Sequence, residues 1–205
     1  MKFRIDLKIF FFLFLFFLTK QIKIYLIVLG FAFLHELAHM LVGLILGFKP
    51  IQIEVLPFGF NITLLPKKED FNFKIKKSNL VELKYIYIAV AGPVFNLIVA
   101  TIFSCISVKM PNKIFELITY SNLLLFIFNL IPIYPLDGGR VLWSILIINK
   151  DAYVVKEYMK NITKITTIVL TIISSIAILY LKNIAVLFII VYLWILAWKE
   201  KIYKT

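Results

Sequence analysis

The chain has 205 residues, 62% of them hydrophobic, and its mean hydropathy of +0.96 is far above that of soluble domains. Its 23 Lys and Arg exceed its 11 Asp and Glu and give a net charge of +12. These basic residues fall in short segments between apolar runs, where they set topology and contact anionic lipid. The composition therefore indicates an integral membrane protein and excludes nucleic-acid binding.

Six apolar segments approach the roughly 20 residues that a membrane-spanning helix requires. They cover residues 5–19, 24–48, 85–108, 114–131, 162–181 and 183–198. A signal peptide is the alternative for the first segment, but no small-residue cleavage site follows it. No repeat or flexible linker interrupts the chain. We therefore predict an all-α integral membrane protein of about six transmembrane helices, forming a single domain over residues 1–205.

The charge distribution predicts how these six spans are oriented. One side holds both termini, residues 49–84 and residues 132–161, and carries 18 of the 23 Lys and Arg when Lys164 is counted with it. Because positive charge marks the cytoplasmic side, both termini are predicted to face the cytoplasm.

The second span contains the motif His-Glu-Leu-Ala-His at residues 35–39, which includes the only two histidines of the chain. Residues four apart on a helix share one face, so His35 and His39 can bind one metal ion. Zinc accepts imidazole ligands, and Glu36 is placed to take a proton from a zinc-bound water. An ionisable cluster among apolar residues is costly, which favours a functional site over a chance match.

The segment that follows the second span has the alternation of a β-hairpin. Over residues 51–65, apolar and polar side chains alternate on both sides of a Pro-Phe-Gly turn at 57–59. A membrane-associated hairpin would present a strand edge with which an extended peptide substrate can pair. The alternative is an interfacial hairpin that only packs over the helices.

A third zinc ligand is needed, and without another histidine it must be a carboxylate or Cys105. The best candidate is Asp137, in the stretch Asn-Leu-Ile-Pro-Ile-Tyr-Pro-Leu-Asp-Gly-Gly-Arg at 129–140. Its prolines and glycines predict a broken helix, and broken helices at membrane depth normally line a cavity. The alternative is an ordinary cytoplasmic turn, because Asp-Gly is common in turns.

Three ordered motifs over about 100 residues resemble the site-2 protease family of intramembrane zinc metalloproteases. They are the histidine motif at 35–39, Ala-Gly-Pro at 91–93 with Asn96, and the Asn-to-Gly stretch at 129–139. The six-span layout, the short hairpin and the absence of a PDZ insertion resemble the sporulation branch, of the stage IV sporulation protein FB type. Members of that branch often carry a C-terminal CBS domain, which we do not expect here.

The resemblance implies specific roles for these residues. His35, His39 and Asp137 would bind one Zn²⁺ per chain, and Glu36 would be the general base. The stretch with Asn129, Pro132 and Pro135 would lie near the substrate or the oxyanion.

For Asn96, the resemblance is compatible with a hydrogen bond to a zinc ligand and equally with a purely structural hydrogen bond.

The predicted activity is hydrolysis of a peptide bond in a membrane-tethered protein, and the sporulation branch implies a pro-sigma-like substrate. The resemblance also implies inhibitory membrane partners and a bacterial cytoplasmic-type membrane, including the membrane around the forespore. The alternative is a non-peptidase membrane protein that binds or moves a metal, or an inactive scaffold. A transporter should show inverted repeats, and a scaffold should have lost Glu36 or Asp137, so both alternatives are less favoured.

Overall fold

The computed structural model describes residues 2–18, 20–56, 59–66, 75–181 and 194. It divides into two compact units, Met1–Asn129 and Leu130–Thr205, and each unit is described by itself. The organisation of the chain as one domain stays a prediction.

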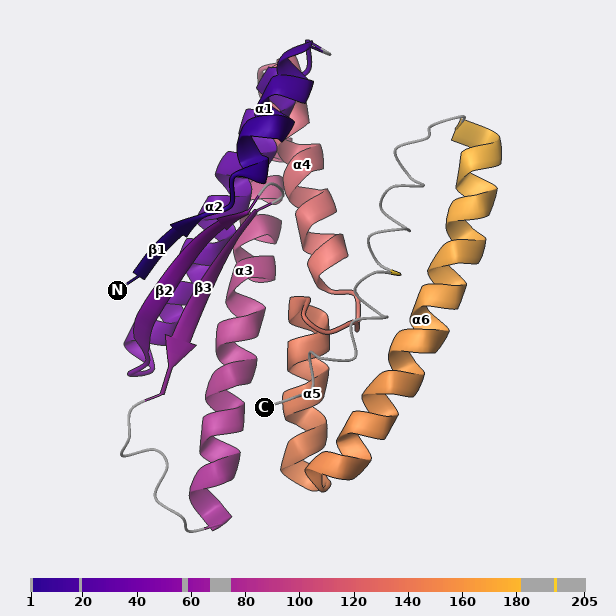
Figure 1. The fold of residues 1–205 in the computed structure, drawn as a ribbon. Helices are drawn as coiled ribbons and strands as arrows, with labels where there is room; N and C mark the ends of the chain where they lie inside the picture. The colour runs from indigo at the N-terminus through magenta and orange to yellow at the C-terminus, as the bar shows by residue number, and fades with distance from the viewer. Residues whose placement is uncertain (1, 19, 57–58, 67–74, 182–193, 195–205) are drawn as a thin grey trace. The chain divides into compact units, whose positions relative to one another are not determined.

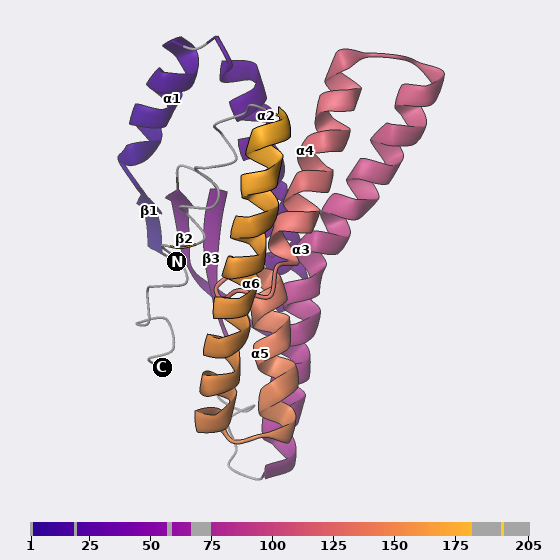
Figure 2. The same cartoon turned by 90° about the vertical axis from the view of Figure 1, so that its right-hand side faces the viewer.

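The first unit contains the four helices α1 (Lys8–Leu18), α2 (Ile22–Ile45), α3 (Ile75–Lys109) and α4 (Lys113–Asn129). A short loop joins α3 to α4, and the two helices contact each other (Figure 2). Asn112 begins α4, because its side-chain oxygen accepts a hydrogen bond from the backbone N–H of Ile114 at 2.9 Å.

Three strands form a sheet in the order β1 (Lys2–Ile5), β2 (Lys49–Leu56) and β3 (Gly59–Leu65), packed against α2 (Figure 1). β2 and β3 pair antiparallel, with Glu54 opposite Asn61, so the predicted hairpin at 51–65 is confirmed. The sequence did not predict β1, which pairs parallel to β2.

Alternation along β3 decides which face of the sheet meets α2. Phe60, Ile62 and Leu64 fall on one face, and Phe60 packs against Phe33 of α2 with ring centroids 4.8 Å apart. A Cβ atom added at Gly43 of α2 would lie 2.6 Å from Leu64 Cδ1, so this glycine allows the strand to approach the helix closely.

The second unit contains α5 (Asp137–Asn149) and α6 (Ala152–Leu181), which contact each other after a short turn (Figure 1). Residues 130–136, which precede α5, are not helical. The predicted break after Asn129 is therefore confirmed. Proline explains it, since Pro132 and Pro135 lack the N–H that a continuing helix would need.

The distribution of polar and apolar side chains is inverted relative to that of a soluble protein. Ile45 of α2 is 82% exposed and Ile102 of α3 is 50% exposed, whereas Asn96 and Asn122 are 0% exposed. Large exposed apolar surfaces on long helices face lipid rather than water. The prediction of an integral membrane protein is thus supported by the structure as well as by composition.

The prediction of six spans is not reproduced among the described residues. Two helical segments there, Ile22–Ile45 and Asn79–Lys109, are long and apolar enough to cross a membrane. α4 has 17 residues, because it ends before Pro132, and the expected span at 162–181 lies within α6. The expected span at 183–198 lies outside the described residues except for Trp194.

The first predicted span, residues 5–19, is wrong. The chain is a strand up to Ile5, and α1 has 11 residues. At 1.5 Å per residue, α1 is about 16 Å long, roughly half of the hydrocarbon core. The prediction failed because hydropathy does not distinguish a short, phenylalanine-rich helix from a helix that crosses the membrane.

We predict that Gly43→Leu destabilises the first unit by about 1–3 kcal/mol, because the new side chain occupies the volume of Leu64. Gly30→Leu is the matched control, since Gly30 lies in the same helix and a Cβ there meets nothing within 4 Å. Thermal unfolding in detergent micelles measures both variants. Equal stability of the two variants would show that Gly43 does not set the approach of β3 to α2.

Candidate metal centre and active site

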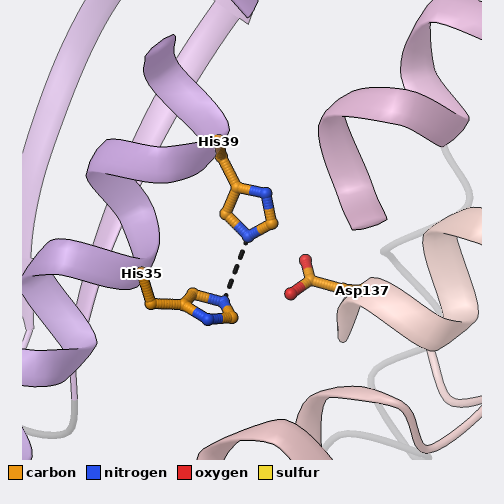
Figure 3. A group of neighbouring side chains, drawn as sticks. All are labelled: His35, His39 and Asp137. Carbon is orange, nitrogen blue, oxygen red and sulfur yellow. Dashed lines mark hydrogen bonds between the residues drawn. The ribbon is translucent and has the colours of Figure 1, made fainter. Parts of the chain in front are cut away.

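Two buried histidines on one face of α2 form the centre of the site. His35 is 4% exposed and His39 is 3% exposed, and their Nε2 atoms lie 3.1 Å apart (Figure 3). The rings meet edge to face, at an interplanar angle of 87°. The spacing of four residues thus brings the two nitrogens together, as the sequence predicted.

Helix α3 holds each ring through its other nitrogen. His39 Nδ1 donates to the backbone carbonyl of Ile88 at 2.6 Å, and His35 Nδ1 lies 2.9 Å from Asn96 Nδ2. Pro93, inside α3, supplies no backbone N–H to the preceding turn of the helix. The structure thus shows a contact between Asn96 and the predicted zinc ligand His35, which is one of the two alternatives that the sequence left open.

Gly92 of α3 leaves space beside the two imidazole rings because it has no side chain. A Cβ atom at this position would lie 2.6 Å from His35 Nε2 and would also overlap His39 Nε2. Only a residue without a side chain can occupy this position while both nitrogens point toward it.

These features fit a zinc ion. Zinc–nitrogen bonds of about 2.0–2.1 Å in a tetrahedral site place two ligand nitrogens about 3.3 Å apart, close to the observed separation. Two buried imidazoles, each held through Nδ1, are the usual way in which a protein presents Nε2 to zinc.

Glu36 follows His35 on the same turn of α2 and is half-buried. A helix rotates about 100° per residue, so its carboxylate leaves α2 beside the histidine face rather than on it. In this position a carboxylate can accept a proton close to the metal without being a metal ligand itself, as the motif requires.

Asp137, in the second unit, is the first residue of α5 and is 4% exposed. Its Oδ1 lies 3.8 Å from Arg140 Nη1, one helical turn later. A carboxylate at a helix N-terminus is favoured by the helix dipole.

Two glycines fix the turn that leads into α5. A Cβ at Gly138 would lie 2.8 Å from the carbonyl oxygen of Ile131, and one at Gly139 would lie 2.6 Å from that of Ile133. Both neighbours are backbone atoms, which cannot rotate away. The Gly-Gly pair is thus what allows residues 130–136 to fold back over the start of α5.

Other predicted site residues fall near the break. Asn129 ends α4, and its side chain donates to the carbonyl of Leu125 at 3.0 Å. Pro132 and Pro135 lie in the non-helical stretch and are half-buried. Cys105 is exposed on α3, nine residues after Asn96 and so about 13 Å further along the helix axis, which argues against it as a zinc ligand.

Sequence reasoning missed two parts of the site. The carbonyl of Ile88 carries no side-chain signal and was not predictable. Gly92 was noted only as part of the Ala-Gly-Pro motif at 91–93, whereas the structure shows that it makes room for the imidazoles. A glycine next to a proline at membrane depth is the signal that pointed to this position.

Comparison with solved structures defines the class of this fold. The Site-2 Protease from Methanocaldococcus jannaschii matches with a TM-score of 0.69 at 22% identity, over 98% of this chain and 90% of that one. The chain therefore has the fold of a site-2 protease. Residues 107–174 match the model of peptidase family M50.

Curated relatives agree with this assignment. Stage IV sporulation protein FB of Bacillus subtilis is 29% identical over 71% of this chain and 47% of that protein. A zinc metalloprotease of Methanocaldococcus jannaschii is 34% identical over 55% of this chain and 31% of that protein. The chain thus spans less than half the length of either relative.

We predict that Gly92→Ala lowers zinc occupancy at least about 10-fold, because the added methyl group lies where both Nε2 atoms point. Gly30→Ala, in open space on α2, should retain wild-type zinc. Metal analysis of detergent-purified protein after dialysis measures both. Wild-type zinc content in Gly92→Ala would show that the ion does not lie over this glycine.

Proposed function

We propose that this chain is an intramembrane zinc metalloprotease that hydrolyses a peptide bond in a membrane-associated protein. The observation that carries the proposal is the pair of buried imidazoles, with Nε2 atoms 3.1 Å apart over Gly92, beside a glutamate in the same motif. The match of residues 107–174 to peptidase family M50 supports it.

We propose His35, His39 and Asp137 as the three zinc ligands. All three side chains are buried and carry donor atoms that zinc accepts. Asp137 lies within the residues that match the family model, in the stretch where two prolines and two glycines interrupt the helices. When bound, zinc supplies Lewis acidity, which acidifies a water molecule and polarises a peptide carbonyl.

In this scheme Glu36 is the general base. Its carboxylate takes a proton from the attacking water as the new C–O bond forms, and delivers it to the leaving amine as the C–N bond breaks. Asn129, Pro132 and Pro135 are proposed to lie beside the substrate.

The edge of the sheet is proposed to hold the substrate. Among the described strands, β1 covers one edge of β2 and β3 covers the other, so the outer edge of β3 is available to an extended peptide. Phe60 of β3 packs against Phe33, two residues before His35, which places this strand alongside the proposed zinc-binding turn of α2. A membrane helix must unwind before it can pair in this way, so helix-breaking residues near the scissile bond should speed cleavage.

We further propose a pro-sigma-like protein as the substrate, with both termini of the enzyme in the cytoplasm and, in a sporulating cell, the membrane around the forespore as its location. The support is the relative named Stage IV sporulation protein FB and the 18 of 23 basic residues on the proposed cytoplasmic side. Regulatory partners of such an enzyme would be inhibitory membrane proteins.

We predict that Glu36→Gln leaves zinc bound but lowers cleavage by about 100-fold or more, since the amide cannot accept the proton. Co-expression in bacterial membranes with a tagged pro-sigma-type substrate, followed by immunoblotting, measures the shortened product. Metal analysis of the same variant is the control for the site. Cleavage by the variant at the wild-type rate would rule out this role for Glu36 and favour a metal-binding protein without peptidase activity.

We predict that Asp137→Ala lowers zinc affinity by more than the roughly 10–100-fold typical of losing an outer hydrogen-bond partner. Arg140→Ala is the matched control, because it removes the same ion pair but no proposed ligand. Competition with a chelating dye measures both affinities. Equal affinities in the two variants would reject Asp137 as a ligand.

A further inference from the structure

The outer face of the sheet, which is turned away from α2, carries a row of polar side chains that ends at Asn61 of β3. Arg4 of β1 is paired with Glu54 of β2, and Glu54 is paired with Asn61. Asn61 Nδ2 donates to Glu54 Oε2 at 3.3 Å, and Gln52 Nε2 donates to Glu54 Oε1 at 2.7 Å. Arg4 Nη1 lies 3.9 Å from Glu54 Oε1. Polar contacts therefore connect all three strands on this face.

The inner face of β3, which meets α2, is apolar (Figure 1). Ile62 is 8% exposed, and the ring of Phe60 packs against that of Phe33. Side chains of a strand alternate between its two faces, so Asn61 and the exposed Thr63 lie on the outer face. The outer edge of β3 thus offers a neighbouring strand one apolar side and one polar side.

We infer that Asn61 and Thr63 determine which residues of the substrate face outward when an extended segment pairs with β3. Every second side chain of that segment would lie beside the apolar face, and the others would lie beside Asn61 and Thr63. An amide has two N–H groups and a carbonyl oxygen, so Asn61 can bind a polar side chain while it donates to Glu54. The substrate is therefore a segment in which polar and apolar residues alternate. This inference rests on the proposed protease function.

Alternation distinguishes such a segment from an ordinary membrane span, which is apolar at nearly every position. A shift of the paired segment by one residue would move every polar side chain to the inner face, beside Ile62, where it would lose its hydrogen bonds to water. Successive peptide bonds of a strand also point in opposite directions within the sheet. The alignment that β3 selects therefore presents only every second peptide bond in the orientation that can be cleaved.

A membrane-tethered reporter whose cleavable segment alternates Thr and Val tests the inference, because these two side chains have nearly the same shape. Its peptide bonds are of two kinds, Thr–Val and Val–Thr, and mass spectrometry of the products gives the cleavage rate at each kind. We expect the wild-type chain to cleave one kind about 10-fold faster than the other. An all-Val segment has no polar side and should show no preference. Equal cleavage at both kinds of bond in the alternating segment would overturn the inference.

Substitutions at position 61 separate substrate selection from folding of the sheet. Asn61→Leu removes the amide, so the ratio of the two cleavage rates should fall by about 2–5-fold. Asn61→Gln keeps an amide and should keep the wild-type ratio. Asn149→Leu is the matched control, because Asn149 is an exposed asparagine on α5, and it should leave the ratio unchanged. A variant that only weakens the fold slows cleavage at both kinds of bond equally, so an unchanged ratio in Asn61→Leu would overturn the role of Asn61.

The same experiment distinguishes this inference from the proposed function. A wild-type chain that cleaves neither reporter and no pro-sigma-type substrate would refute both. A wild-type chain that cleaves the alternating segment equally at bonds of both kinds would refute only the selection by β3 and leave the protease proposal standing.

Discussion

A polar group at membrane depth is costly unless it finds a partner within the protein, and this cost organises the site in the first unit. Two imidazoles on α2 present four ring nitrogens among apolar side chains, where water is not available to satisfy them. The structure meets the requirement with one contact between the rings and two contacts to α3. The histidines of α2 therefore depend on α3 for their hydrogen-bond partners.

This dependence explains why α3 has the sequence it has near the site. Ile88, Gly92 and Asn96 are four residues apart, so they lie along one face of the helix. They supply, in order, an acceptor, an open space and an amide. An apolar helix without Gly92 and Asn96 would offer His39 the same backbone carbonyl, but it would give His35 Nδ1 no side-chain partner and would fill the space beside the two Nε2 atoms.

The sequence was most informative where the chemistry is local. The spacing of His35 and His39 follows from one helical turn, and the hairpin follows from alternation around a Pro-Phe-Gly turn. The break before α5 follows from two prolines and two glycines within a few residues, which together disfavour a continuous helix. In each case the residues and their neighbours in the chain are sufficient.

Features that depend on distant contacts were beyond the sequence. The parallel strand β1 owes its pairing to β2, about 50 residues later, and its own sequence resembles the edge of a hydrophobic segment. The acceptor of His39 is a backbone carbonyl, which every residue has. Hydropathy also predicted too long a first helix, because it measures how apolar a segment is and does not show where the helix begins.

The pairing of β1 with β2 has a consequence for the order in which the protein is assembled. Phe3 pairs with Ile53, so the first strand leaves the ribosome long before its partner is synthesised. In the interval α2 must enter the bilayer, and β1 has to stay on the side to which the chain returns. The sheet therefore cannot close until residues 52–55 have been synthesised, and its closure joins the two ends of the segment that contains α1 and α2.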